Sequence, residues 1–392
     1  MITRTLPRLF SSSSFVQGYS TNANPVRWGI LSAGRIASDY VKAISVTEGA
    51  VAAAVAARSP AKAASFASQH SIPASTGSYD ELITNPEVDV VYIGTIADHH
   101  AEWAKESILA GKPTVVEKPM TLSYADTKEL VDLARERNVF LMEGMWTRCF
   151  PAIQKLRHLI SSQEIGPIIY ATGDFGWAFP KNSPDDRIWF PQSGGVTLDV
   201  GMYIAQLGQV AFPGGTVKDV SARGTMKNGV DYSVMATVTY DRNEQPNNGS
   251  GDEDGLLHLT LTGAANTEER TVLQGTKGRI VLDGPSHVPR RIRVLYDEGR
   301  DESSSNEVVY DYPLPEDPYG EWNNPGSIGF VHQIEEVGRA LKEGRKECAQ
   351  FTWEDSLEVA RIIDSILVQV RGREASNIVE EDWAEEPQAG SS

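Results

Sequence analysis

The chain has 392 residues, which is long for one domain and sufficient for two domains that each bury a core. Its 36 lysines and arginines are outnumbered by 53 aspartates and glutamates, and the formal net charge of -17 argues against nucleic-acid binding because it repels a phosphate backbone. The two cysteines, Cys149 and Cys348, indicate no disulfide framework, and no apolar run reaches the roughly 18 residues of a membrane span. We therefore expect a two-domain protein of reducing surroundings that does not cross a membrane.

Residues 1–24 differ in composition from the rest of the chain. They contain Arg4, Arg8 and a serine run over residues 11–14, and the first acidic residue of the chain is Asp39. This composition is typical of an organellar transit peptide, whereas a secretory signal would need an apolar block that these residues lack. We expect import into a mitochondrion or plastid. The alternative is a disordered leader on a cytoplasmic protein.

From Val26 onward, apolar strands alternate with helices. The pattern predicts a strand over Val26–Leu31, a helix over Arg35–Val46, a strand over Ala50–Ala57 and a helix over Ala61–His70. This order is a βαβ unit, and we expect residues 25–148 to form a doubly wound parallel sheet of the Rossmann type.

The turn after the first strand, over residues 32–37, fits the fingerprint of a dinucleotide-binding loop, although Ser32 stands where the first glycine is usual. Gly34 matters most, because a residue without a side chain lets the backbone approach a pyrophosphate at the start of the next helix. The first cofactor-binding candidates are therefore Ser32, Gly34, Arg35 and Ile36.

The second strand runs into Ala57-Arg58-Ser59. NAD enzymes usually carry a carboxylate here for the ribose hydroxyls, whereas a nearby arginine accommodates the 2'-phosphate of NADP. Arg58 and Ser59 therefore predict NADP as the cofactor. The alternative is that Arg58 is a surface residue on the approach to the next helix.

Residues Val88–Thr95 form another continuous apolar strand, followed by His99, His100 and a helix that runs to Ala110. The end of this strand should face the cofactor, which makes Thr95 and His100 cofactor-binding candidates. Metal binding by the two histidines is disfavoured because no carboxylate lies at ligand spacing.

The strand Val115–Lys118 ends in Glu117-Lys118-Pro119, and a helix with a capping residue at Ser123 follows. Open α/β sheets bind ligands at the carboxyl ends of their strands, and Pro119 restricts Lys118 to an extended backbone. We expect Glu117 and Lys118 to contact the cofactor. The alternative is a charged pair that solvates the strand end. A strand over Val139–Met142 completes the first domain.

Beyond Pro151, short β-rich segments alternate with turns and predict a mostly antiparallel sheet in a domain over residues 149–378. A polar loop is expected over 241–255, a helix that opens at Thr352–Asp355 and stops at Gly372, and an acidic disordered tail over 379–392. The expected strands are Ile168–Phe175, Val217–Thr225, Val234–Tyr240, Leu256–Thr262, Gly278–Leu282 and Arg291–Leu295.

Three motifs give the chain a family resemblance over about residues 26–371. They are the degenerate glycine turn, Glu117-Lys118-Pro119, and the segment Gly194–Tyr203. With them the chain resembles the glucose-fructose oxidoreductase and inositol dehydrogenase family, Gfo/Idh/MocA. Residues 143–148 and 185–187, and Tyr203 where many members carry histidine, make it similar to the branch of dimeric dihydrodiol dehydrogenases and NADP-dependent D-xylose dehydrogenases. Ser32, Ile96 and Ala97 depart from the usual pattern in the cofactor loops.

The resemblance implies an NADP-dependent enzyme that transfers hydride between nicotinamide and a sugar, polyol or vicinal diol. It also implies a homodimer whose interface is the large open sheet of the second domain. The implied catalytic residues are Lys118, Asp199 and Tyr203, and the implied substrate contacts are Trp146, Arg148, Arg187, Asp199 and Tyr203. On the residues alone, Trp146 is either a core residue or a wall of the substrate pocket.

Asp199 and Tyr203 are four residues apart, so they share a face if residues 195–209 contain a helix. Oxidation of an alcohol needs a hydride acceptor, which NADP supplies, and a base for the hydroxyl proton. Tyrosine, with a reference pKa of about 10, is a poor base at neutral pH, but an ammonium about 4 to 6 Å away lowers such a pKa by about 1 to 3 units. We expect Lys118 to lower the pKa of Tyr203 and Asp199 to orient substrate hydroxyls. The alternative is a capping aspartate and a packed tyrosine.

A second hypothesis for function is a catalytically silent NADP-binding regulator or sensor. The joint presence of Lys118, Asp199 and Tyr203 argues against it. Pentose, hexose, dihydrodiol and dicarbonyl substrates are not distinguished by these residues.

Overall fold

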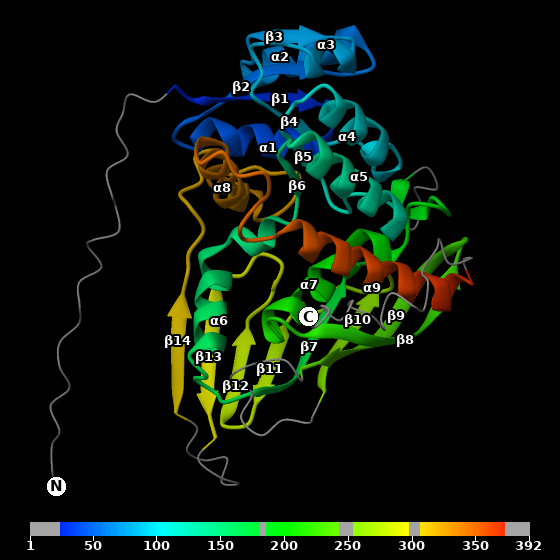
Figure 1. The fold of residues 1–392 in the computed structure, drawn as a ribbon, viewed down its shortest axis with the longest axis vertical. Helices are drawn as coiled ribbons and strands as arrows, with labels where there is room; N and C mark the ends of the chain where they lie inside the picture. Colours follow the sequence, from blue (N-terminus) through cyan, green and yellow to red (C-terminus); the bar gives the residue numbers. More distant parts are fainter. Residues whose placement is uncertain (1–23, 181–185, 243–253, 298–305, 373–392) are drawn as a thin grey trace, which may run out of the picture.

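The computed structural model describes residues 24–180, 186–242, 254–297 and 306–372. The expected transit peptide lies outside the described residues apart from Asn24, as do the expected acidic tail and most of the polar loop over 241–255. Within the described ranges, no helix is long and apolar enough to cross a membrane. The chain forms two sheets, which lie one above the other in Figure 1.

The first sheet has six parallel strands in the order β3-β2-β1-β4-β5-β6. Its central strands do not alternate: β4 is buried at every position and β1 at every position but Arg27, because helices cover both faces. The strand order reverses between β1 and β4, and open α/β sheets bind ligands beyond the carboxyl ends of strands at such a point. The strands are β1 (Val26–Leu31), β2 (Ala50–Ala56), β3 (Ala74–Thr76), β4 (Val90–Ile93), β5 (Thr114–Val116) and β6 (Leu141–Glu143).

Helices lie on both faces of this sheet (Figure 1). One of them, α8 (Phe330–Lys342), comes from far along the chain and packs against α1, although the expected boundaries assign it to the second domain. The rings of Tyr40 and Phe330 are 5.1 Å apart, and Tyr40 stacks on Tyr92 of β4 at 3.7 Å. The other helices are α1 (Arg35–Val46), α2 (Pro60–His70), α3 (Tyr79–Ile83), α4 (His100–Leu109) and α5 (Tyr124–Arg137).

The second sheet has eight strands in the order β14-β13-β12-β11-β7-β10-β9-β8, and only the β7–β10 pair is parallel among the described strands. The predicted fold class, a Rossmann sheet followed by a mostly antiparallel sheet, is therefore confirmed. The strands are β7 (Ile168–Gly176), β8 (Thr216–Lys227), β9 (Val230–Asp241), β10 (Gly255–Thr262), β11 (Thr271–Gly275), β12 (Gly278–Leu282), β13 (Arg291–Tyr296) and β14 (Glu307–Asp311).

Three helices cover one face of the second sheet: α6 (Pro151–Ser161), α7 (Met202–Ala211) and α9 (Trp353–Arg371). The predicted start of α9 is a capping box between Thr352 and Asp355, and its predicted stop, Gly372, has a φ of 62°. The helix also reaches the first sheet, because the Trp353 indole N–H donates to the carbonyl of Leu141 in β6 at 2.9 Å.

A carboxylate on α1 holds the returning chain in place. Asp39 is fully buried, and its oxygens accept hydrogen bonds from the backbone N–H groups of Asn323 and Asn324 at 2.9 Å and from the Ser327 hydroxyl at 3.0 Å. Charge-assisted bonds of this kind are stronger than neutral ones. The segment that leads into α8 is therefore fastened to α1.

Candidate active site

The predicted dinucleotide loop lies between β1 and α1. Gly34 is the N-cap of α1, the cap has no side-chain hydrogen bond, and the first turn carries no acidic residue. These N–H groups and the helix dipole suit a diphosphate, with Arg35 and Ile36 as the first helical residues. Ser32 has a φ of 111°, a conformation that favours glycine. The sequence therefore lacks the usual glycine at this position, but the backbone keeps the conformation that a glycine would adopt.

Arg58 and Ser59 lie at the carboxyl end of β2, next to this loop in the sheet order. The Ser59 hydroxyl oxygen accepts a hydrogen bond from the Lys62 N–H at 3.4 Å and caps α2. Arg58 is exposed. A guanidinium and a hydroxyl at this position can contact a ribose phosphate.

Thr95 and His100 lie at the end of β4. The Thr95 hydroxyl is buried without a hydrogen-bond partner in the described structure, which suits a residue that meets a cofactor hydroxyl or amide. His100 links the loops after β4 and β5, because its ring nitrogens lie 2.7 Å from the carbonyl oxygen of Pro119 and 3.1 Å from that of Thr95. Burial lowers the pKa of His100, which favours the neutral ring.

Lys118 follows β5 and points toward the second sheet. Its ammonium donates a 2.7 Å hydrogen bond to the backbone carbonyl of Asp199 and lies 4.0 Å from the Asp199 carboxylate. Glu117 faces the other way and accepts a 2.8 Å hydrogen bond from the Tyr92 hydroxyl. Burial lowers the pKa of Lys118, and the Asp199 carboxylate opposes that shift.

Asp199 lies in a π-helix over Thr197–Gly201 that leads directly into α7, so the helix expected over residues 195–209 begins with wider turns than an α-helix. Its carboxylate accepts hydrogen bonds from the Trp177 indole and the Arg187 guanidinium, both at 2.9 Å. Burial would raise the pKa of the Asp199 carboxyl, but Arg187 and Lys118 outweigh burial and hold that pKa below its usual value. The structure thus brings Lys118, Asp199 and Arg187 together.

Tyr203 borders the same group, with its ring centroid 5.1 Å from the Lys118 ammonium. Its hydroxyl oxygen accepts a 3.0 Å hydrogen bond from the Trp146 indole N–H, which brings Trp146 to the same group of residues, called the pocket below. The expected lowering of the Tyr203 pKa is wrong for this structure: burial raises that pKa well above its usual value, and the Glu117 carboxylate adds to the rise. The sequence could not show how deeply the phenol is buried.

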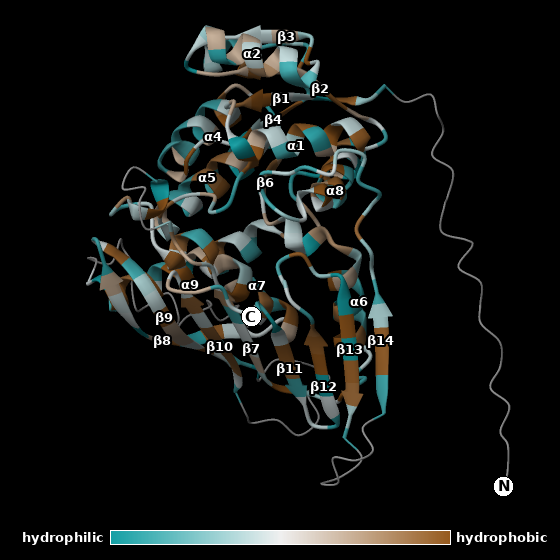
Figure 2. Ribbon diagram, turned by 180° about the vertical axis from the view of Figure 1, so that it is seen from behind, coloured by the Kyte–Doolittle hydropathy of each residue, from teal (hydrophilic) through white to brown (hydrophobic). Residues whose placement is uncertain are grey.

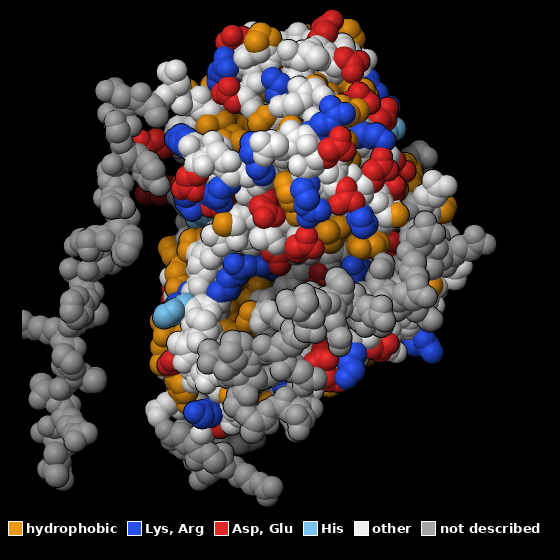
Figure 3. Space-filling view, viewed as in Figure 1, with side chains coloured by type: hydrophobic (Ala, Val, Ile, Leu, Met, Phe, Trp, Pro, Cys, Tyr) orange, Lys and Arg blue, Asp and Glu red, His pale blue; other side chains and the backbone are white. Residues whose placement is uncertain are grey.

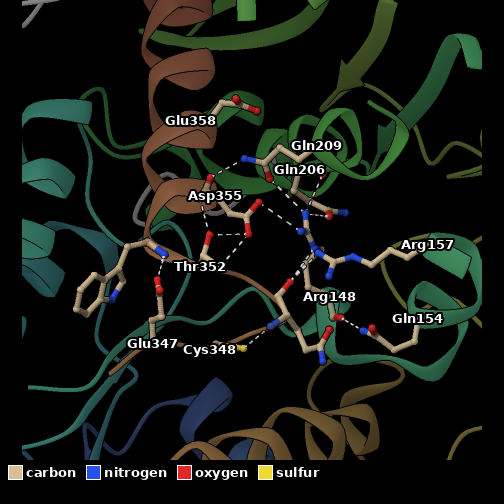
Figure 4. Close-up of polar contacts among 12 residues, drawn as sticks. Arg148, Gln154, Arg157, Gln206, Gln209, Glu347, Cys348, Thr352, Asp355 and Glu358 are labelled. Carbon is tan, nitrogen blue, oxygen red and sulfur yellow. Dashed lines mark hydrogen bonds and ion pairs between the residues drawn. The ribbon is translucent and has the colours of Figure 1, made fainter. Parts of the chain in front are cut away.

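Arg148 lies apart from these residues, in a buried network between α6, α7 and the start of α9 (Figure 4). Its guanidinium donates to the carbonyls of Gln350 and Gln206 and to the side chain of Gln209 at 3.1 to 3.2 Å, and pairs with Asp355 at 3.4 Å. Burial lowers the pKa of Arg148 to about 10. These contacts give Arg148 a structural task, and it has no part in the substrate site proposed below.

Three pocket residues were not found from the sequence: Phe175, Trp177 and His287. The Phe175 ring stacks on Tyr203 at 5.6 Å, and the His287 ring lies 5.3 Å from Tyr203. Trp177 follows β7 directly, a position that could have been noticed, whereas nothing in the sequence around His287 places it near α7. Across the described ranges, no cluster of three or more histidine, cysteine or acidic side chains could hold a metal ion.

Comparisons with known proteins match both halves of the chain. The Gfo/Idh/MocA description "Oxidoreductase family, NAD-binding Rossmann fold" matches residues 26–145, and the Gfo/Idh/MocA C-terminal domain matches residues 153–281. Trans-1,2-dihydrobenzene-1,2-diol dehydrogenase of Danio rerio is 33% identical over 351 residues, 88% of this chain and 97% of the relative. The Homo sapiens protein of the same name is 31% identical over 350 residues, 87% and 96% of the two chains.

Solved structures show the same fold. Levoglucosan dehydrogenase in complex with NADH and levoglucosan has a TM-score of 0.75 at 20% identity, and the match covers 89% of this chain and 98% of that one. A 3-ketoreductase from Actinomadura kijaniata in complex with NADP and TDP-benzene has a TM-score of 0.71 at 20% identity, with the same coverage.

The Rossmann domain and these relatives define an oxidoreductase that binds a nicotinamide dinucleotide and acts on CH–OH groups. The alternative of a silent cofactor-binding regulator is not favoured. The chain belongs to the Gfo/Idh/MocA oxidoreductase family.

Proposed function

We propose that this enzyme oxidises a hydroxyl of a sugar or vicinal diol with NADP, and that Lys118, Asp199 and Tyr203 carry the chemistry. The observation that carries the proposal is the position of the Lys118 ammonium at the end of β5, 2.7 Å from the Asp199 carbonyl and 5.1 Å from the Tyr203 ring. NADP, when bound, accepts the hydride. Lys118 would bind the substrate oxygen, while Asp199 and Arg187 would orient its hydroxyls.

The aromatic walls of the pocket favour a ring-shaped diol. Trp146 and Phe175 contact Tyr203, and Trp177 donates to the Asp199 carboxylate; flat rings pack well against cyclic substrates. Relatives named for a dihydrobenzene diol support the same class. A panel of cyclic diols, pentoses and hexoses, followed by NADPH absorbance, tests the proposal; the absence of turnover with every diol and sugar would contradict it.

Arg58→Ala should weaken NADP binding by about 1.5 to 3 kcal/mol, the range for hydrogen bonds to charged groups, and leave NAD binding nearly unchanged. The reason is that only NADP carries the phosphate that Arg58 would contact. Titration calorimetry with both cofactors measures the difference. Arg137→Ala, at an exposed arginine on α5, is the control. Equal losses for the two cofactors would remove Arg58 from the phosphate site.

The outer face of the second sheet supports a homodimer. Met235 of β9 is 67% exposed between the buried Val234 and Ala236, so it points away from the helices. At the edge, Val308 and Val309 of β14 are 37% and 45% exposed. Hydrophobic side chains gather over β14 in Figure 3, whereas the brown colour of β12 and β13 in Figure 2 belongs largely to buried residues such as Ile280 and Ile292. Exposed apolar side chains on an open sheet are typical of a surface that a second subunit covers.

Met235→Glu should convert the dimer to a monomer, because a charge buried in an isologous interface is repeated in both subunits. Light scattering measures the mass. Leu109→Glu, at an exposed apolar residue on α4, should leave the mass unchanged. A wild-type protein that runs as a monomer at all concentrations would refute the interface.

Residues 1–24 are proposed to direct import into a mitochondrion or plastid, on the strength of their arginines, serines and missing acids. A fluorescent protein fused after residue 24 should be imported into the organelle. A cytoplasmic signal would assign these residues to a leader without an address.

A further inference from the structure

His287 is placed at the pocket by a loop between β12 and β13. Its ring lies 4.8 Å from Phe175, 5.3 Å from Tyr203 and 6.3 Å from Trp146, measured between centroids. The side chain is 19% exposed, so water can reach one edge of the ring. The loop is held to the pocket wall, because the Thr147 hydroxyl donates to the His287 carbonyl at 2.6 Å.

Glu269 pairs with this imidazole. Its carboxylate lies 2.7 Å from Nδ1 of His287, and its own side chain is 17% exposed. The backbone around Glu269 is fixed from both sides: the N–H groups of Glu269 and Arg270 donate to the Asp174 carboxylate at 3.0 and 3.1 Å, and the Ser286 N–H donates to the Glu269 carbonyl at 2.8 Å. The Glu269–His287 pair is therefore held in place by hydrogen bonds to the surrounding backbone.

The proposed oxidation releases the proton of the substrate hydroxyl, so it needs a group that accepts this proton. Tyr203 is buried, and its hydroxyl oxygen already accepts a hydrogen bond from Trp146. Burial and Glu117 raise its pKa, so it is protonated at neutral pH and can accept a proton only while it gives one away. Histidine is the side chain that ordinarily changes charge near neutral pH, and a carboxylate at Nδ1 stabilises the imidazolium.

Resting on the proposed function, we propose that the Glu269–His287 pair is the proton relay behind Tyr203. As the substrate C–H bond gives its hydride to NADP, the substrate O–H proton passes to the Tyr203 oxygen, and the Tyr203 proton passes to Nε2 of His287, directly or through one water. Glu269 keeps its charge and stabilises the imidazolium, which then releases its proton to solvent. Reduction runs the same steps in reverse.

The charge on His287 is set by few neighbours in the described structure. Glu269 faces it from the loop before β11 and Tyr203 faces it from α7, while Trp146 and Phe175 carry no charge. Oxidation needs the neutral imidazole as proton acceptor, so oxidative kcat/KM should fall toward acidic pH. Reduction needs the imidazolium, so reductive kcat/KM should fall as the pH rises.

His287→Asn tests the relay, because the asparagine amide can still donate to Glu269 in place of Nδ1 while Nε2 is lost. Oxidative kcat at neutral pH should fall about 100-fold, the low end for general acid–base catalysis, with KM and the NADP Kd within about 3-fold of wild type. The acidic limb of the pH profile should disappear. Glu269→Gln should also lower oxidative kcat, because the imidazolium that forms loses its counter-charge.

His332→Asn is the matched control, since His332 is a second partly buried histidine that packs on Phe150 beside a carboxylate, 4.0 Å from Glu335. It should change neither kcat nor the limb. A His287→Asn enzyme with wild-type kcat and an unchanged limb would overturn the relay while the proposed function stands. A wild-type enzyme that turns over no sugar or diol would overturn both, and a Glu269→Gln enzyme with wild-type kcat would overturn the role of Glu269.

Discussion

Replacing Lys118 by methionine is expected to lower kcat by about 10²- to 10³-fold, the range for removing a donor to the reacting oxygen, and to change NADP affinity far less. Methionine keeps the length of the side chain and removes the charge. The substrate oxygen then loses its donor, and the Asp199 carbonyl, 2.7 Å from the ammonium, loses its partner. Steady-state kinetics and cofactor titration measure the two quantities. Lys105→Met, at an exposed lysine paired with Glu129, is the control.

Tyr203→Phe is expected to lower kcat by a similar factor, because the phenol stands between the substrate and the proton acceptor in the proposed mechanism. Residues that act as one unit are strongly non-additive, so the double variant with Lys118→Met should be scarcely slower than the slower single variant. Losses that multiply, or a Tyr203→Phe enzyme with most of its kcat, would mean that the proton leaves by another route.

Asp231→Ala is expected to lower the free energy of unfolding by about 3 to 5 kcal/mol, the cost of removing one partner of a buried ion pair. Asp231 is fully buried on β9 and pairs with Arg371 at the end of α9. It also accepts hydrogen bonds from the N–H and hydroxyl of Thr197, at 2.7 and 2.6 Å, where the π-helix begins. The variant would leave the Arg371 charge buried and the first turn around Asp199 unsupported.

Chemical denaturation measures this loss as a lower midpoint at an unchanged slope. Asp219→Ala, at an exposed aspartate on the neighbouring strand β8, should stay within about 0.5 kcal/mol of wild type. An Asp231→Ala protein with wild-type stability would contradict the account. The same contacts explain why Gly195 is glycine: its φ is 92°, and a Cβ atom there would meet the Asp231 carboxylate.

Sequence patterns predicted the helices and strands whose signals lie within a few neighbouring residues. β1 and α1 have the predicted bounds, and α9 begins at the predicted opening, Thr352–Asp355, because an apolar run, a turn and a helix start are each visible within a few residues. β3 has three residues with no buried position, and β14 is an exposed edge strand of five residues, so neither shows the alternation of a half-buried strand. α8 was missed although it has a buried face, because the surface that buries it belongs to α1.

The residues of the candidate site also divide into those that the sequence predicted and those that it did not. Motifs predicted Lys118, Asp199 and Tyr203, and the structure brings them together around one ammonium. Arg148 shares a segment with Trp146, but the side chains lie in different surroundings, one in the buried network of Figure 4 and the other at the pocket. His287 depends on how a loop between two strands folds against α7, which no spacing in the sequence records.

The fastening of the returning chain to α1 bears on how the protein is made. Asp39 leaves the ribosome early, but its hydrogen-bond partners, residues 323–327, and the helix α8 that packs on Tyr40 are synthesised almost 300 residues later. Until then the Asp39 carboxylate and the apolar face of α1, which are buried in the folded protein, remain exposed in the nascent first half. The nucleotide-binding half therefore reaches its final form only near the end of translation. A ribosome that stalls while it translates the second sheet leaves an incompletely folded chain for chaperones to bind.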